Sequence, residues 1–403
     1  MKPGVLLTDA HARSTVGTCE CLARHGYRVA AATSDPPAPG QWSRRVSTRL
    51  RLPDPRAEPR LFAEQVAAAV RAADIATVLP GSDASLLALS DHRDLFAGGV
   101  RLGLPASEVV DRCVDKVALL AEAANAGLAA PSSIACDDSE AAISTAARLG
   151  YPVLLKPRQT VFDDHGERRQ RQSAIVEDEA DLLAALPGFG LPCLVQSFET
   201  GDTVSIAGVA AGDRLLAIAF SRYARTWPPR AGPVSSSRTE VPPGDLVERT
   251  ARLIGALGWQ GIFELELIAR ADGEFAAIDF NPRLYGSVAL AARAAAPIPK
   301  VWCDWVMYGK ADECAASAGV FYRWEEAEAR NLLLRLRSGQ LGEAISILRP
   351  RRPIARAYFR WSDPLPALTM LARMVRSRLA GRRSARAERA AELAASSGDG
   401  VAP

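Results

Sequence analysis

The sequence predicts a mixed α/β and α+β protein, in which an open, mostly parallel sheet precedes units that combine antiparallel and parallel strands. Apolar strands alternate with amphipathic helices over the first hundred residues, as parallel strands joined by helical crossovers require. Hairpin signals dominate after about residue 190. The chain has 403 residues, more than one hydrophobic core usually serves. We therefore expect four parts, residues 1–105, 106–195, 196–312 and 313–403.

Composition narrows the class of protein. Apolar residues make up 48% of the chain, and 49 basic side chains nearly balance 46 acidic ones, so we expect neither nucleic acid nor membrane as an obligatory partner. The seven cysteines are scattered and odd in number, which fits a reducing cytoplasm better than a disulfide framework. No uninterrupted apolar run approaches the roughly 20 residues of a membrane span.

The first unit begins as strand, helix and strand. Residues 4–8 (GVLLT) read as a buried strand, residues 14–26 have helical spacing, and residues 27–33 return as a strand. A dinucleotide site would need a glycine-rich turn here, but TDAHARSTVG contains only Gly17, which argues against a nicotinamide or flavin dehydrogenase. The pattern then continues as a helix, a strand with its turn and a helix, over 61–73, 75–82 and 84–96.

The second unit mixes elements of both classes. We expect a long helix over residues 107–127 that ends at Gly127, and a polar connection rich in Arg, Gln and Asp after the strand at 152–157. The other predicted elements are helices at 139–149 and 178–186 and strands at 173–177 and 192–198.

The third unit begins with antiparallel strands. The segment TVSIAGVAAGDRLLAIAFSR contains two alternating strands joined by a Gly-Asp turn, and residues 262–282 predict a second hairpin with ADG at its tip. The helix between them, 245–257, ends at Gly258. Further helices are expected at 287–295 and 325–338, with a short strand at 320–324.

The second hairpin carries the residues most suited to chemistry. Strand alternation places Glu264 and Glu266 on one face of its first arm, and Asp279 and Asn281 on one face of its second arm. Two carboxylates about 4 Å apart repel by roughly 4 kcal/mol at an effective dielectric constant near 20, so such crowding needs a cation. Carboxylates with phosphate oxygens and water suit Mg²⁺. The alternative is a hairpin with a solvated acidic face.

These motifs resemble those of a known superfamily. GIFELEL followed by IDFNPRLYGS resembles the metal-binding hairpin of ATP-grasp proteins. DKVALLAEAANAGLAAPSS, YPVLLKP and LVQSFETGDTVSIAG precede it in that superfamily's order and approximate spacing, so the resemblance covers roughly residues 105–310. It implies an ATP-grasp fold of two α+β lobes, 106–195 and 196–312, after an N-terminal α/β domain and before a small C-terminal extension. The sequence is similar to carboxylate–amine ligases of the carbamoyl-phosphate synthetase large-subunit type.

The resemblance implies roles for individual residues. A point-charge ammonium suits a polyphosphate, so the two motif lysines look like phosphate contacts, and the hairpin oxygens look like metal ligands. Arg283 would neutralise the transferred phosphate or the acyl phosphate. The implied nucleotide contacts are Lys116, Lys156, Gln196 (adenine) and Asp202 (ribose), and the implied metal ligands are Glu266, Asp279 and Asn281. Each also has a plain structural alternative, such as a solvated lysine, a satisfied strand amide or an Arg283–Asp279 ion pair.

A basic stretch lies between the hinge strands and the metal hairpin. Residues 221–240 carry four arginines around Trp227, which is typical of an anion site with an apolar wall. In similar ATP-grasp proteins this region faces the acceptor carboxylate, so Arg222 is expected to join Arg283 as a catalytic residue. An Arg- and Pro-rich surface loop is the alternative.

Two segments depart from a simple pattern. Where ATP-grasp proteins often carry a glycine-rich loop over the phosphates, residues 158–173 contain one glycine and several arginines, which leaves closure of this loop open. The C-terminal stretch ALTMLARMVRSRLAGRRSARAERA is basic and amphipathic. That composition suits a helix on anionic lipid or an acidic partner, or a docking helix that leads into a disordered tail.

The resemblance implies an ATP-dependent ligase. With ATP and Mg²⁺, or Mn²⁺ as the alternative metal, it would activate a small-molecule carboxylate as an acyl phosphate and join it to an amine, with release of ADP and phosphate. A kinase that phosphorylates a hydroxyl and a nucleotide-binding protein without turnover are the rival hypotheses. The two substrates and the oligomeric state do not follow from the sequence.

Overall fold

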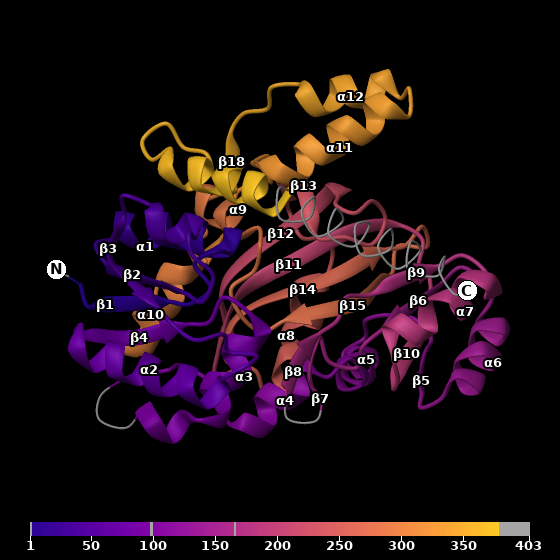
Figure 1. Ribbon diagram of the computed structural model, residues 1–403, viewed down its shortest axis with the longest axis horizontal. Helices are drawn as coiled ribbons and strands as arrows, with labels where there is room; N and C mark the ends of the chain where they lie inside the picture. Colours follow the sequence, from indigo (N-terminus) through magenta and orange to yellow (C-terminus); the bar gives the residue numbers. More distant parts are fainter. Residues whose placement is uncertain (1, 97–99, 165–166, 379–403) are drawn as a thin grey trace, which may run out of the picture.

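Three sheets organise the molecule. The structure, a computed structural model, describes residues 2–96, 100–164 and 167–378, without the side chains of residues 162–168. A four-stranded sheet near the N-terminus lies on the left in Figure 1, a large sheet fills the centre, and a second four-stranded sheet lies on the right. The predicted mixture of a parallel sheet with antiparallel and mixed units is confirmed.

The N-terminal sheet is parallel throughout, with the strand order β3-β2-β1-β4. Its strands β1, β2 and β4 and helices α1–α3 follow the predicted pattern. Strand β3 was not predicted, because its side chains alternate between partly buried and exposed at the edge of the sheet. The elements are β1 (Gly4–Leu7), α1 (Arg13–Arg24), β2 (Arg28–Thr33), β3 (Val46–Arg51), α2 (Pro59–Ala72), β4 (Ile75–Leu79) and α3 (Asp83–Asp91), with 3₁₀ turns at Pro39–Trp42 and Arg93–Phe96.

The second sheet has the order β5-β10-β6-β9 and is covered on one face by two helices. Val153, Leu155 and Val195 point into the core beneath these helices, so strand alternation puts Lys156 and Gln196 on the opposite face. The expected boundary at residues 195–196 falls inside β10. The elements are β5 (Ser133–Cys136), α6 (Ser139–Leu149), β6 (Val153–Lys156), β9 (Ala174–Val176), α7 (Glu179–Phe189) and β10 (Cys193–Ser197).

The long helix predicted over residues 107–127 is wrong in one respect: it is two helices. Helix α4 (Ser107–Val114) ends before Asp115, and α5 (Lys116–Asn125) begins after it. The Asp115 carboxylate accepts a hydrogen bond from the Val117 amide at 2.9 Å, as an N-cap does. An aspartate that caps a new helix competes with continuation of the old one, and helical periodicity alone does not reveal this. Lys116 therefore lies at a helix N-terminus.

The large sheet has the order β15-β14-β11-β12-β13-β17-β18, with β16 paired to β12. Both predicted hairpins are present, as β11–β12 and β14–β15. The polar connection after β6 also folds as strands, β7 and β8, which pair only with each other. The strands are β7 (Val161–Asp164), β8 (Glu167–Gln170), β11 (Asp202–Ala211), β12 (Arg214–Thr226), β13 (Val234–Glu240), β14 (Gly261–Ala269), β15 (Phe275–Asn281), β16 (Cys314–Ala315), β17 (Phe321–Arg323) and β18 (Ile354–Arg356).

The two faces of the large sheet pack against different helices. Val204, Ile206 and Phe220 point towards α8 (Leu246–Leu257), whereas Ala207 and Val209 pack on the other face, together with α10 (Ile298–Tyr308) and residues of the N-terminal sheet. Helix α9 (Val288–Arg293) packs against α1. Because side chains alternate along a strand, Ser205 shares the face of Ala207, and its cross-strand partner Glu266 does too. That face therefore carries the site.

The C-terminal part contributes strands to the large sheet. Strand β17 pairs with β13, and helices α11 (Glu325–Arg337) and α12 (Leu341–Leu348) rise above the sheet in Figure 1. Residues 365–378 are helical, and the remainder of the predicted basic helix lies outside the described residues. Among the described helices, none has the length and apolar character to cross a membrane.

One ion pair fastens α11 to the sheet. Glu328, only 3% exposed, accepts hydrogen bonds from Arg225 (3.0 Å), Ser235 (2.8 Å) and Asn331. We expect Arg225→Met to lower the free energy of unfolding by about 3–5 kcal/mol, because it leaves a buried carboxylate without its cation. The control Arg222→Met removes an arginine whose partner Asp202 is 68% exposed, and should cost about 1 kcal/mol or less. Equal losses of unfolding free energy in the two variants, measured by chemical denaturation, would contradict this prediction.

Candidate functional site

The site is built on the hairpin of β14 and β15. In the antiparallel register Glu266 lies directly opposite Asp279, and Glu264 lies opposite Asn281. Directly paired residues on one face have Cβ atoms about 4.5–5.5 Å apart, so the four polar side chains form a compact group, as predicted. A register shift after Glu266 ends the regular ladder at this point.

Two lysines from outside the large sheet reach this hairpin. Lys116, at the start of α5, forms an ion pair with Asp279 at 3.2 Å and donates to the Thr160 hydroxyl at 3.1 Å. Lys156, at the end of β6, donates to the backbone oxygen of Ile278 at 3.0 Å. The lysines are 7% and 6% exposed. The structure therefore brings both predicted phosphate lysines to strand β15, Lys116 to the predicted metal ligand Asp279 and Lys156 to the backbone of the preceding residue.

The buried charged groups shift one another's pKa values. Burial lowers the pKa of Lys156 to about 8, although Asp279 acts to raise it. Burial acts to raise the pKa of Asp279, but the Lys116 and Lys156 ammonium groups outweigh it, so that this pKa is lowered. Asp279 is thus ionised, and the two ammonium groups lie beside it in an environment that concentrates positive charge.

At the two glutamates, burial and repulsion outweigh the nearby positive charges. Burial raises the pKa of both Glu264 and Glu266, and repulsion adds to it, from Glu266 in the first case and from Asp279 in the second. Their hydrogen-bond donors are mostly neutral: Tyr223 donates to Glu266 at 3.0 Å and Ser287 donates to Glu264 at 3.2 Å. Acids crowded in this way favour a bound cation.

The donor set fits a magnesium ion that is shared with a nucleotide. Glu266 and Asp279 supply carboxylate oxygens on one face, and Asn281 adds an amide oxygen from the same strand. Among the described residues, no group of three or more His, Cys, Asp or Glu side chains is arranged to hold a metal alone. A hard cation bound by two carboxylates would complete its shell with phosphate oxygens and water, which is the usual coordination of Mg²⁺.

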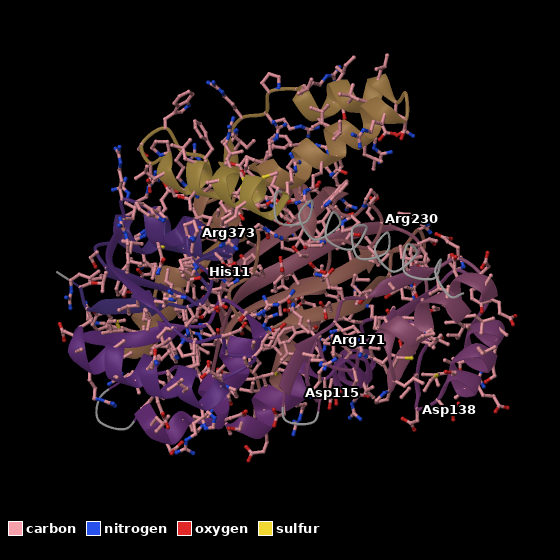
Figure 2. All side chains as sticks on the ribbon, viewed as in Figure 1. His11, Asp115, Asp138, Arg171, Arg230 and Arg373 are labelled. Carbon is pink, nitrogen blue, oxygen red and sulfur yellow. The ribbon has the colours of Figure 1, made fainter. Side chains whose placement is uncertain are left out.

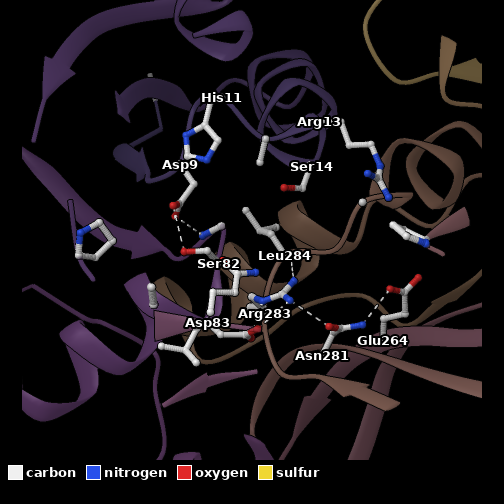
Figure 3. A pocket seen from close by; sticks show the side chains of 18 of the residues that line it. Asp9, His11, Arg13, Ser14, Ser82, Asp83, Glu264, Asn281, Arg283 and Leu284 are labelled. Carbon is white, nitrogen blue, oxygen red and sulfur yellow. Dashed lines mark hydrogen bonds and ion pairs between the residues drawn. The ribbon is translucent and has the colours of Figure 1, made fainter. Parts of the chain in front are cut away.

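Arg283 links the hairpin to the N-terminal sheet. Its guanidinium donates to the Asp83 carboxylate at 2.6 and 3.1 Å and to the Asn281 amide oxygen at 3.0 Å. Figure 3 shows this chain of contacts from Asp83 through Arg283 and Asn281 to Glu264. The partner of Arg283 is therefore Asp83 and not Asp279, the partner considered from the sequence.

A cavity of about 480 Å³ opens between the hairpin and the N-terminal sheet. Its walls come from the loop after β1, the loop after β4 and the hairpin, so all three sequence-distant segments meet here (Figure 3). Glu264, Glu266, Asn281 and Arg283 line one side. A pocket of this size accepts a small metabolite.

Gln196 lies on the face of the second sheet that carries Lys156. It is 1% exposed, and its amide nitrogen donates to the Ser133 hydroxyl at 2.7 Å. Its Oε1 is buried and has no hydrogen-bond partner within the part of the chain that the structure describes. A buried acceptor without a partner costs free energy, so this oxygen is a candidate to receive a donor from a ligand.

Two predicted site residues do not join the cluster. Arg222 shares the sheet face of Phe220, opposite to that of Ser221 and Glu266, and it forms ion pairs with Asp202 at 2.8 Å and Glu240 at 3.1 Å. The expectation that Arg222 faces the reacting groups is therefore not supported, because strand alternation turns it away. Asp202, at the beginning of β11, is mostly exposed and lies on this opposite face as well.

Several other arginines of the two basic stretches also have carboxylate partners. Arg158 pairs with Asp115, and Arg225 pairs with Glu328. Arg230, in the turn after β12, pairs with Glu177 beside the second sheet, and Figure 2 shows it at that end of the large sheet. The basic stretch at 221–240 is thus a pair of strands and a turn, and three of its four arginines form ion pairs with carboxylates of the protein.

Sequence reasoning missed three groups that support the site. Tyr223 lay inside the basic stretch and gave no separate signal. Ser287 is the fourth residue after the NPR motif, and its hydroxyl donates a hydrogen bond to Glu264. Asp83 could not be found, because its role depends on contact between residues 200 positions apart.

The crowding of Glu266 has a testable consequence for stability. A glutamate whose folded pKa rises from 4.5 to about 7 stabilises the fold only at low pH, and this contribution is lost as the pH rises through that window. Without metal or nucleotide, Glu266→Gln should therefore be more stable than the wild type at pH 8, by about 1–2 kcal/mol, and the gain should shrink at pH 5.

Thermal unfolding at both pH values measures this difference. The control Glu274→Gln, an exposed glutamate near the tip of the same hairpin, should show no such pH-dependent gain. A loss of stability in Glu266→Gln at pH 8 would show that the ionised carboxylate is already compensated.

The sequence of the chain is only distantly similar to known proteins. No family model matches the chain. The large chain of carbamoyl phosphate synthase (C-terminal section) from Methanopyrus kandleri is 24% identical over 224 residues, which are 50% of this chain. The match covers 39% of that protein, so the chain spans about two fifths of the curated relative.

Solved structures resemble the whole arrangement more fully. N5-carboxyaminoimidazole synthetase from Staphylococcus aureus aligns with a TM-score of 0.60 at 11% identity, over 79% of this chain and 80% of that one. L-amino acid ligase from Bacillus licheniformis aligns with a TM-score of 0.58 at 14% identity, over 76% and 74%. The biotin carboxylase domain of 2-oxoglutarate carboxylase from Hydrogenobacter thermophilus, solved with MgADP and bicarbonate, gives 0.59 at 15% identity, over 80% and 74%. The chain therefore has the fold of these ligases, the ATP-grasp fold that its motifs resemble.

Proposed function

We propose that this protein is an ATP-dependent carboxylate–amine ligase with ATP and Mg²⁺ bound between its second sheet and its metal hairpin. The observation that carries the proposal is the convergence of Lys116 and Lys156 on Asp279, beside Glu266. Two ammonium groups next to paired carboxylates suit a metal-bound polyphosphate. The relatives support it, since their names describe ligases and synthetases and one holds MgADP.

The chain's own residues would divide the work as follows. Lys116 and Lys156 would hold phosphate oxygens, and the unpartnered Gln196 Oε1 would accept a hydrogen bond from the base. Glu266, Asp279 and Asn281 would hold the metal. A bound Mg²⁺ supplies charge neutralisation for the phosphates. Asp202 stays a predicted ribose contact, and Arg222 has no part in this proposal.

The reaction then proceeds in two balanced steps. A substrate carboxylate oxygen attacks the γ-phosphorus, the bond to the β-phosphate oxygen breaks, and ADP leaves as an acyl phosphate forms. The amine nitrogen next attacks the acyl carbon, inorganic phosphate leaves, and the nitrogen loses a proton. Arg283, fixed by Asp83, would offset the negative charge on the phosphate. Positioning and charge would supply most of the rate.

The proposal also assigns each substrate to a part of the fold and the protein to a cellular location. We infer that the N-terminal sheet and the hairpin share the acid substrate, while the second sheet and the hairpin share the nucleotide. We also propose that the protein works in the cytoplasm on small molecules.

A screen for product formation tests the ligase. With MgATP, the twenty amino acids and a set of small carboxylic acids should be tried for release of ADP and phosphate. Hydroxylamine should trap an acyl phosphate as a hydroxamate. Asp279→Ala should lower the rate at least about 100-fold, because it removes a metal ligand and the partner of Lys116. Asp272→Ala, at the exposed tip of the same hairpin, is the control and should keep full activity.

The rival functions give different outcomes in this screen. A kinase would leave phosphate on a hydroxyl and would give no hydroxamate. A nucleotide-binding protein would bind MgATP and would form neither product. Full activity in Asp279→Ala would overturn the metal assignment.

A further inference from the structure

Three arginines line the cavity between the hairpin and the N-terminal sheet, and they differ in one respect. Arg56 donates to Asp54 at 2.7 Å, and Arg283 donates to Asp83 at 2.6 Å. Arg13 has no carboxylate partner among the described residues, and its Nε is buried without a hydrogen bond. Placing a guanidinium partly out of water without a directly bonded carboxylate is costly, and Arg13 is the arginine of this cavity in that position.

The surroundings of Arg13 hold it in place without neutralising it. Its guanidinium lies over the Trp324 ring, 4.0 Å from the ring centroid. It also lies against the backbone of Gly286, where an added Cβ would approach the guanidinium nitrogen to 2.3 Å. An aromatic face and a glycine therefore form a cradle for the flat guanidinium group. The Tyr322 hydroxyl accepts one hydrogen bond from it, and Nε has no partner among the described residues.

Ser14 adds a second unpartnered polar group beside Arg13. It is 3% exposed, lines the same cavity, and its hydroxyl makes no hydrogen bond to another described residue. Both residues begin helix α1, whose N-cap Ala12 offers no side-chain acceptor and whose first turn holds no acid. The amides and dipole at this helix end therefore add to the preference for an anion.

The position of Arg13 and Ser14 relative to the hairpin indicates which anion they would bind. Figure 3 shows Arg13 and Ser14 on one side of the cavity and Arg283, Asn281 and Glu264 on the other. Arg13 and Ser14 line the same cavity as Glu264 and Glu266. An anion bound by Arg13 would therefore lie next to the metal acids, where the reacting carboxylate has to be.

We propose that Arg13 and Ser14 bind the carboxylate of the acid substrate and present it to the γ-phosphate. This inference rests on the proposed function and assigns to the N-terminal domain the role that the sequence placed on Arg222. A guanidinium and a carboxylate form paired, charge-assisted hydrogen bonds, which fix orientation as well as position. The cavity of about 480 Å³ limits the acid to a molecule of roughly amino-acid or dipeptide size.

Three variants and a control test this assignment. Arg13→Gln and Ser14→Ala remove donors, and Gly286→Ala keeps every charge but displaces the Arg13 guanidinium. Arg24→Gln is the matched control, because Arg24 lies on the same helix α1, pairs with Glu20 and is absent from the cavity walls. For the acid that gives the highest turnover in the screen, KM should rise about 10–100-fold in Arg13→Gln and less in Ser14→Ala.

The KM for ATP should stay unchanged in all four variants, which separates substrate binding from a general loss of structure. Gly286→Ala should raise the KM for the acid with an unchanged thermal midpoint, since only the end of a flexible side chain has to move. Calorimetric titration of the same acids in the presence of MgADP gives a readout that does not depend on turnover, and Arg13→Gln should lose the binding heat.

The outcomes distinguish this inference from the ligase proposal. Normal acid affinity in Arg13→Gln, together with acyl phosphate formation, would overturn the role of Arg13 and leave the ligase intact. If the wild-type protein neither binds nor activates any acid, both the role of Arg13 and the ligase proposal are overturned. Loss of acid affinity with normal MgADP binding supports both.

Discussion

The rest of the site depends on the neutralisation of Asp279 by two ammonium groups that come from outside its own sheet. Lys116 lies at the N-terminus of α5, and Lys156 lies at the end of strand β6 in the second sheet. Without them, three acids on one hairpin would repel one another in a poorly solvated space. With them, the second sheet is held against the hairpin even when no ligand is present. The same charges that close the lobes are the charges that a triphosphate needs.

The other half of the site depends on a contact between the N-terminal sheet and the hairpin. Asp83 begins helix α3 and holds Arg283, which in turn holds Asn281. The hairpin is therefore positioned from both sides, by lysines from one direction and by an aspartate from the other. A ligase that passes an acyl phosphate from one partner to the next requires such alignment of separate domains.

Local patterns predicted the parts that depend on local physics. The alternation of Glu264, Glu266, Asp279 and Asn281 follows from strand geometry, and the structure confirms their pairing. The predictions that failed concern residues whose placement depends on strand register or on contacts between distant parts of the chain. Arg222 is one residue from Ser221, and one residue decides which face of a strand a side chain takes. The break at Asp115, which puts Lys116 at a helix N-terminus, looks like any charged position in a helical pattern. Arg13 carries no motif, and only its missing partner identifies it.

The pairing of β17 with β13 has a consequence for how the chain can be divided. If the molecule were cut after residue 312, strand β13 would become the open margin of a long, mostly buried sheet. Unsatisfied backbone groups along such a margin recruit further strands, from the same or other molecules. Strand β17 thus covers the hydrogen-bonding edge of β13, and a protein shortened in this way would be prone to self-association before any question of activity arose.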